Sequence, residues 1–281
     1  MTPWQRLGRK LEKQATQWMP PALRRSVLTL LARDRPKRAI DVREDDAFIV
    51  SYPKSGNTWV RFLVANLLYP DPTDFETLET RVPTIYKNTR RELDSFPSPR
   101  VLKSHEYFDP RYRRVVYLVR DPRDVVISYF HYSLRKGSIA MGHSLTDFAA
   151  DFLAGKMGNV GSWQENVASW LAARDGSPNF LLVHYEHLRA RPVDEATRIA
   201  RFLNCASDQV SIQRAVAASS FERMRELEKA SGSTLQLKKK GADIPFVRKG
   251  RVGGWREELP DDVRVAIEAA WGPLMQRLGY L

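Results

Sequence analysis

Short apolar runs alternate along the chain with longer segments in which apolar residues recur at helical spacing. The apolar runs are too short for helices and predict buried strands; they span residues 47–50, 100–104, 115–119 and 180–183. The helical pattern covers residues 58–68, 145–153, 162–174, 193–204, 207–217, 221–228 and 261–278, and a further helix begins at Asp121-Pro122. Continuous apolar strands separated by helices are typical of parallel sheets covered on both faces. The pattern therefore predicts an α/β fold, a single domain with a central parallel sheet flanked by helices.

The first 38 residues carry most of the positive charge. The formal net charge is +12, and residues 1–38 hold ten Lys or Arg against two acidic residues, which accounts for +8. Apolar residues recur here at helical spacing until Pro20-Pro21 interrupts them. We expect a basic helical extension at residues 1–45, followed by one domain at residues 46–281. The simplest interpretation is helices packed on the domain or on a partner; peripheral membrane contact is the alternative, and no specific nucleic-acid partner is expected.

The composition excludes several classes of protein. Hydrophobic residues make up 43% and charged residues 28%, which is typical of a folded globular chain. The single cysteine, Cys205, excludes a disulfide framework and fits a reducing compartment. The sequence has no run of 18 apolar residues, so no transmembrane helix is predicted. Residues 1–20 lack the apolar block of a secretory signal. These features favour a cytoplasmic protein, and His184 and His187 lack a third ligand for a metal.

The turn between the first strand and the first helix has the chemistry of an anion site. It reads Ser51-Tyr52-Pro53-Lys54-Ser55-Gly56-Asn57-Thr58-Trp59. The free amides and the dipole at a helix start favour an anion. Lys54 adds a full positive charge, and Gly56 lets the backbone approach a phosphate closely. The order differs from the common triphosphate loop, in which the lysine comes late. Considered alone, an ordinary strand–helix turn with an incidental lysine remains the alternative.

Two further clusters repeat this chemistry. Arg120 directly follows the strand at residues 115–119, and Ser128 comes eight residues later, about two turns into the next helix. Towards residue 250, Arg248 offers a planar fork for phosphate and Lys249 a point charge. Three clusters suited to phosphate, two of them at strand ends, predict a ligand with phosphates at separated positions.

At these residues the chain resembles the cytosolic type of sulfotransferase that uses 3′-phosphoadenosine 5′-phosphosulfate (PAPS). Residues 52–59 are similar to that family's 5′-phosphosulfate loop, residues 120–128 to its 3′-phosphate motif, and Arg248-Lys249-Gly250 to its late motif. The three occur in the family's order, and matching pieces span residues 46–281. The resemblance implies a P-loop-like nucleotide-binding core, PAPS as co-substrate, 3′-phosphoadenosine 5′-phosphate (PAP) as product, and no metal.

Carried over position by position, the resemblance assigns a nucleotide site. Asn57 stands where threonine is more usual, Trp59 matches the aromatic residue that stacks on adenine, and Tyr185 matches an adenine-contacting tyrosine. The residues implied to bind the nucleotide are Lys54, Ser55, Gly56, Asn57, Thr58, Trp59, Arg120, Ser128, Tyr185, Ser219, Phe221, Arg248, Lys249 and Gly250.

Sulfonate transfer needs a base for the acceptor's proton and positive charge on the leaving phosphate oxygen. Among the five histidines, His105 follows a predicted strand beside the phosphate loops, in Lys103-Ser104-His105. The resemblance implies that His105 is the general base and that Lys54 and Lys103 stabilise the transition state. Glu106 is the alternative base, as in some carbohydrate sulfotransferases. Adjacent residues of an extended chain point to opposite sides, so only one of the two faces the acceptor; we expect His105.

The acceptor and the competing functions stay open at this stage. A small-molecule, sugar or lipid hydroxyl or amine is expected, in a pocket built from loops at residues 69–99, 108–111, 135–143 and 230–246. Residues 69–99 are rich in Pro, Asp and Thr and predict surface loops, while residues 230–255 predict a mobile basic loop. The protein is expected to be a monomer or a homodimer. The alternatives are a P-loop-like kinase, with Asp121 and Asp124 on Mg²⁺, and a non-enzymatic basic anion-binding scaffold acting through residues 1–38.

Overall fold

The computed structural model describes residues 40–205, 208–231 and 244–281, so residues 1–39 of the expected basic extension and much of the expected mobile loop lie outside the described ranges. Four parallel strands form one sheet in the order β2-β1-β3-β4. They are β1 (Ala47–Ser51), β2 (Val101–Ser104), β3 (Arg114–Val119) and β4 (Phe180–His184). Each boundary lies within one residue of the predicted run. The predicted α/β fold with a central parallel sheet is confirmed.

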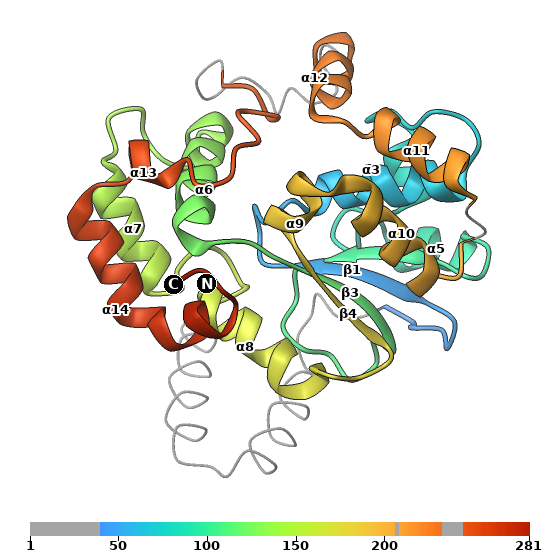
Figure 1. Ribbon diagram of the computed structural model, residues 1–281, viewed down its shortest axis with the longest axis horizontal. Coiled ribbons are helices and arrows are strands. Elements are labelled where there is room, and N and C mark those ends of the chain that lie inside the picture. Colours follow the sequence, from blue (N-terminus) through green and yellow to red (C-terminus); the bar gives the residue numbers. More distant parts are fainter. Residues whose placement is uncertain (1–39, 206–207, 232–243) are drawn as a thin grey trace.

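Both faces of the sheet are buried. Along β1, Phe48 and Val50 belong to one hydrophobic cluster and Ala47 and Ile49 to another, because alternate residues of a strand point to opposite faces. Figure 1 shows α3, α10 and α11 over one face, with α8 on the other and α6, α7 and α14 packed together beside it. These helices are α3 (Asn57–Leu68), α6 (Pro122–Lys136), α7 (Leu145–Leu153), α8 (Trp163–Arg174), α10 (Pro192–Phe202), α11 (Gln209–Ala218) and α14 (Asp261–Arg277).

Residues 69–99 are more ordered than the sequence predicts. They form two short helices, α4 (Leu78–Arg81) and α5 (Arg90–Ser95), and bury Leu78 and Leu93. A capping box between Thr89 and Glu92 starts α5. The expectation of surface loops was therefore wrong for this part, because helices of one turn or so show no apolar periodicity.

A buried ion pair joins the amino ends of the neighbouring strands β1 and β2. Arg100 and Asp46, which precede β2 and β1, meet at 2.6 Å with side chains no more than 1% exposed. The guanidinium also donates to the carbonyls of Asp41 at 2.7 Å and Leu93 at 2.9 Å. A buried ion pair is tolerated only when its remaining donors are satisfied in this way. The backbone at Asp41 is therefore attached to the domain.

The parallel topology gathers the candidate residues at one edge. Because all four strands run the same way, the segments after Ser51, Ser104, Val119 and His184 leave from the same side. The chain passes from β1 to β2 on one side and then crosses to β3 on the other, and ligands of open α/β sheets bind where the strand order reverses in this way. Within the described ranges, no helix combines the length and apolarity needed to cross a membrane.

Candidate active site

The loop between β1 and α3 has a strained backbone. Lys54 has φ +70° and Gly56 has φ +101°, both in the left-handed region. A residue with a side chain pays free energy for this conformation, and such strain clusters at functional sites. Gly56 avoids that cost, and a Cβ there would lie 2.7 Å from the ring of Tyr185. The turn directs the first amides of α3, which have no carbonyl partner within the helix, towards the carboxyl edge of the sheet.

Buried polar atoms beside this loop lack partners. In the part of the chain that the structure describes, Ser55 Oγ and Arg120 Nε are buried without a hydrogen bond. Such groups are rare in folded proteins and indicate a ligand or a functional role. The amide of Asn57 instead donates to Ile49 O and Ser51 Oγ, both at 3.2 Å. The Asn57 side chain therefore ties the loop to β1, and its amide nitrogen is already used there.

Lys54 lies in an aromatic and cationic surrounding. Its ammonium is 4.3 Å from the ring centroid of Tyr132 and 4.7 Å from that of Phe246. Among the described residues, no carboxylate reaches ion-pairing distance of this ammonium. Burial, together with the charges of Arg120 and Arg135, lowers the pKa of Lys54 to about 7. Glu228 opposes this shift from beyond ion-pairing distance. A buried cation without a direct carboxylate partner attracts an anion strongly.

Arg120 connects the three predicted phosphate clusters. Its guanidinium donates to Lys54 O at 3.4 Å and to Arg251 O at 2.9 Å, so it touches both the first loop and the late loop. The same group lies 4.1 Å from the ring centroid of Tyr185. Ser128 is on α6, about two turns beyond Arg120. The structure thus brings the first loop, Arg120 and the late loop together.

His105 is held in one tautomer. Its Nδ1 lies 2.7 Å from Ser51 O, and because a carbonyl only accepts, Nδ1 carries the proton and Nε2 keeps a free lone pair. Burial and the charge of Lys103 lower the pKa of His105 well below 6.5, although the bond to Ser51 opposes this. The backbone is fixed by Tyr86 Oη, which accepts from His105 N at 2.7 Å, and by Asn166 Nδ2, which donates to His105 O at 3.1 Å. The imidazole is therefore neutral near pH 7, and the lone pair of Nε2 is available to an acceptor's proton.

The residues near His105 differ in burial. Lys103 is half-buried, with its ammonium 4.9 Å from the ring centroid of Tyr86, and burial lowers the pKa of Lys103 to about 7. Glu106 is buried, and its backbone carbonyl accepts the indole N–H of Trp170 at 3.0 Å. The charge of Glu106 acts on both Lys103 and Tyr86, so the two candidate bases share the same surroundings.

Three carboxylates hold the late loop, residues 246–255. Glu228, on α12 (Phe221–Ala230), accepts the backbone N–H groups of residues 246 and 247 at 2.5 and 2.8 Å. Asp124 accepts those of residues 253 and 255 at 2.8 and 3.0 Å. Glu258, at the end of α13 (Trp255–Glu258), contacts the two cations of the late motif. The loop is therefore fixed at both ends and in the middle.

The cations of the late motif are neutralised within the protein. Arg248 Nη1 lies 3.0 and 3.2 Å from the two oxygens of Glu258, and Lys249 Nζ contacts the same carboxylate. His131 Nε2 lies 3.3 Å from Glu258 Oε2. His131 is on α6, one turn beyond Ser128 and on the same helical face. Burial would raise the pKa of Glu258, but the bonds and charges of Lys249 and Arg248 lower it to about 2. The carboxylate thus occupies the surroundings predicted for a phosphate.

An apolar cavity of about 190 Å³ lies among α3, α9 (Tyr185–Ala190), α11 and α12. It is lined by Trp59, Leu63, Leu188, Arg189, Pro192, Val216, Ser220, Phe221 and Glu222. The expected aromatic residues Trp59 and Phe221 are in this set, and the ring of Tyr185 packs edge-on against Trp59 at 5.6 Å. Gly250 comes close as well, because a Cβ there would lie 2.6 Å from the ring of Phe221. The late loop therefore adjoins the cavity.

Ser219 is not part of the cavity lining. Its hydroxyl is buried and donates to Ala215 O, and it accepts from Asn66 at 3.4 Å, so Ser220 takes the lining position instead. Arg189, which was not among the predicted site residues, also lines the cavity. Its guanidinium lies 5.8 Å from the ring centroid of Trp59 and 6.0 Å from that of Phe221. Its position four residues after Tyr185, on one face of α9, was the available signal.

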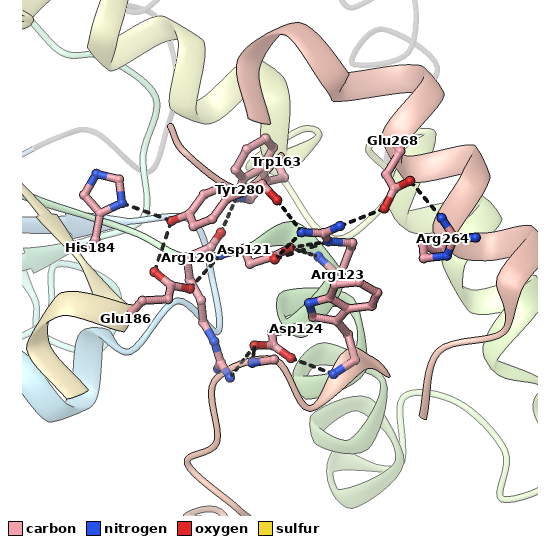
Figure 2. A network of polar contacts seen from close by, with 12 residues as sticks. Arg120, Asp121, Arg123, Asp124, Trp163, His184, Glu186, Arg264, Glu268 and Tyr280 are labelled. Carbon is pink, nitrogen blue, oxygen red and sulfur yellow. Dashed lines mark hydrogen bonds and ion pairs between the residues drawn. The ribbon is translucent and has the colours of Figure 1, made fainter. Parts of the chain in front are cut away.

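Figure 2 shows the polar network around the amino end of α6. Asp121 pairs with Arg123 at 2.8 Å, and Arg123 continues to Glu268 at 2.7 Å. Asp124 binds the backbone of the late loop. The two aspartates that the kinase hypothesis assigns to Mg²⁺ are thus engaged by protein donors, which disfavours that hypothesis.

A parallel α/β sheet whose carboxyl edge carries a cationic loop suited to an anion, a neutral histidine and an aromatic cavity is suited to a nucleotide-dependent transferase. The chain belongs to the sulfotransferase family: the model of the sulfotransferase domain matches residues 44–279. This membership confirms the resemblance drawn from the three motifs and makes the chain a sulfotransferase rather than a kinase.

Curated relatives agree with this assignment. Sulfotransferase 2B1 of Homo sapiens is 31% identical over 251 residues, which cover 84% of this chain and 67% of the relative. Sulfotransferase 1B1 of Mus musculus is 31% identical over 229 residues, covering 75% and 76%. The amine sulfotransferase of Oryctolagus cuniculus is 28% identical over 235 residues, covering 78% and 77%.

Solved structures share the fold. Mouse sulfotransferase SULT7A1, complexed with PAP, superposes with a TM-score of 0.68 at 24% identity and covers 84% of this chain and 86% of its own. Retinol dehydratase, in a complex with retinol and PAP, gives a TM-score of 0.71 at 22% identity, covering 87% and 85%.

Proposed function

We propose that the protein transfers the sulfonate of PAPS to a hydroxyl or amine of a small-molecule acceptor, with His105 as the base. The observation that carries the proposal is the contact of Arg120 with both Lys54 and the late loop, around buried polar atoms that lack partners. The PAP complexes of the structural relatives support the choice of nucleotide.

The residues at the carboxyl edge suit the parts of this nucleotide. Lys54, Ser55 and the first amides of α3 would hold the 5′-phosphosulfate, since they combine a dehydrated cation with unpaired donors. Arg120, with Ser128 and the late motif, would hold the 3′-phosphate. The apolar cavity between Trp59 and Phe221 offers rings for stacking the base.

The catalytic step follows from the tautomer of His105 and the position of Lys54. His105 Nε2 takes the proton from the acceptor's hydroxyl or amine as the acceptor atom bonds to sulfur. Lys54 stabilises the negative charge that develops on the 5′-phosphate oxygen as its bond to sulfur breaks. Lys103, half-buried beside His105, adds positive charge near the transferring sulfonate.

Aromatic rings around the two reacting side chains favour an acceptor with an apolar body. Tyr132 and Phe246 flank the ammonium of Lys54, and Tyr86 stacks near His105 with ring centroids 6.2 Å apart. Such rings bind flat or apolar molecules better than highly charged sugars. Phenols, alcohols and amines are therefore the acceptors to test first.

Two measurements test the proposal. Calorimetric titration with PAP in the presence of EDTA should show binding, whereas ATP with Mg²⁺ should bind more weakly. Incubation with PAPS carrying an isotopically labelled sulfonate, and a panel of phenols, alcohols, amines and sugars, should give products heavier by the labelled group in mass spectra. Preference for ATP with Mg²⁺, or no PAP binding at all, would contradict the nucleotide assignment.

A further inference from the structure

The peptide group that joins Arg120 to Asp121 is held from both sides. Its carbonyl, on Arg120, accepts the indole N–H of Trp163 at 3.2 Å. Its N–H, on Asp121, donates to Glu186 Oε1 at 3.1 Å. Figure 2 shows both contacts at the point where β3 gives way to α6. These two contacts fix the plane of the peptide that follows Arg120 and so help to set the direction of its side chain. The far end of that side chain is held by Lys54 O, Arg251 O and Asp124.

The second oxygen of Glu186 is held by Tyr280. The tyrosine hydroxyl donates to Glu186 Oε2 at 3.2 Å and lies 3.4 Å from His184 Nδ1. Burial raises the pKa of Tyr280 well above its ordinary value, so the hydroxyl keeps its proton and remains a donor. Glu186 thus receives one donor on each oxygen, Tyr280 on one side and the peptide after Arg120 on the other (Figure 2).

The backbone of Tyr280 reaches the same turn by a second route. Its carbonyl accepts from Arg123 Nη2 at 2.6 Å, and Arg123 in turn binds the carboxylate of Asp121 through Nε at 3.0 Å and Nη2 at 2.8 Å. Tyr280 therefore contacts both side chains that fix Asp121, one through its hydroxyl and the other through its carbonyl.

The end of α14 places Tyr280 for this role. Gly279 has φ +75°, its N–H donates to Gln276 O at 3.0 Å, and the N–H of Tyr280 donates to Met275 O at 2.9 Å. This is the pattern of a helix that ends on a left-handed glycine. The reversal turns the chain back across the amino end of α6 (Figure 2).

We propose that Tyr280, acting through Glu186, is a positioning residue that aims Arg120 at the 3′-phosphate of the nucleotide. The inference rests on the proposed function, since it assumes that Arg120 binds this group. Tyr280 touches neither the nucleotide nor the acceptor in this assignment. Its loss therefore weakens recognition of one phosphate and leaves the rest of the site intact.

The test compares two ligands that differ only in that phosphate. Tyr280→Phe removes the hydroxyl and keeps the ring, and PAP and adenosine 5′-phosphate are titrated by calorimetry against the full chain. We expect PAP affinity to fall by about 3- to 10-fold, the effect of one hydrogen bond. Adenosine 5′-phosphate should bind within about twofold of wild type, and the rate at saturating PAPS should stay within the same range.

The matched control is Tyr69→Phe. Tyr69 follows the last turn of α3, about 18 Å along that helix from the phosphate loop, and should change neither affinity. Equal losses for both ligands in Tyr280→Phe would mark a general structural effect and overturn the inference, as would unchanged PAP affinity. If wild type itself binds the two ligands equally, the assignment of the 3′-phosphate to Arg120 fails instead, so the two failures are distinguishable.

Discussion

The two cationic ends of the candidate site differ in how their charge is balanced. Around Lys54, no carboxylate of the described chain reaches ion-pairing distance, and burial lowers the pKa of the lysine to about 7. In the late loop, Arg248 and Lys249 share Glu258, whose pKa they lower to about 2. One end has no paired carboxylate and carries its positive charge up to about pH 7, and the other is neutralised by the protein itself.

The difference predicts that one end of the site serves the chemical step and the other serves nucleotide binding. An uncompensated charge in a dry surrounding stabilises negative charge that develops in a transition state, without the cost of rearranging partners. A cation that already has a carboxylate must exchange one anion for another, so a phosphate gains less from it. We therefore expect substitutions near Lys54 to change turnover most, and substitutions near Glu258 to change nucleotide affinity.

The largest effect is expected at the base. His105→Ala should lower turnover by about 10²- to 10⁴-fold, because proton transfer is lost, while PAP affinity stays within about twofold. Steady-state rates and calorimetry measure the two quantities. His187→Ala, an exposed histidine on α9, serves as the control and should match wild type. Undiminished turnover in His105→Ala would show that His105 is not the base and would favour Glu106, the alternative base.

A pH effect of intermediate size is expected at Lys54. Its charged form is lost as pH rises through about 7, so affinity for adenosine 5′-phosphate should fall above that pH by up to about tenfold per unit. Lys54→Arg keeps the charge across this range and should flatten the profile. Because the ligand phosphate also titrates near pH 6, the arginine variant supplies the baseline. Identical profiles in the two proteins would contradict the lowered pKa.

The smallest effect is expected in the late loop, and its sign is opposite. Glu258→Gln removes the internal anion from Arg248 and Lys249, so PAP should bind more tightly, by about 3- to 10-fold, while adenosine 5′-phosphate is unchanged. Glu257→Gln is the matched control, because the ion pair of Glu257 with Arg251 is exposed and its loss should have little effect. Weaker PAP binding in Glu258→Gln would show that the carboxylate positions the two cations instead of competing for them.

The sequence predicted most where a local signal existed. The strands appeared as apolar runs, and the loop after β1 as a lysine and a glycine between a strand and a helix. Ser219 and Ser220 could not be told apart, because the choice depends on where α11 ends and on Ser220 capping α12. The helices at residues 78–81 and 90–95 are too short to repeat an apolar position at helical spacing, so the sequence shows no periodicity there.

Contacts between distant segments left no such signal. Glu228, Asp124 and Glu258 hold the late loop, yet Asp124 lies 129 residues from its partner Gly253. Tyr280 meets Arg123 across 157 residues. Residues of this kind are ordinary acids and tyrosines in the sequence, and only the packing of α6, α13 and α14 around the carboxyl edge gives them a role.

The buried Asp46–Arg100 pair lies at the amino ends of strands whose opposite ends carry the reacting side chains. The contacts that stabilise the fold and the side chains proposed to react therefore lie at opposite edges of the same sheet. A campaign to widen the range of acceptors can randomise the loops at one edge while leaving the anchoring ion pair untouched, and damage to the anchor should appear as lost yield before it appears as altered selectivity.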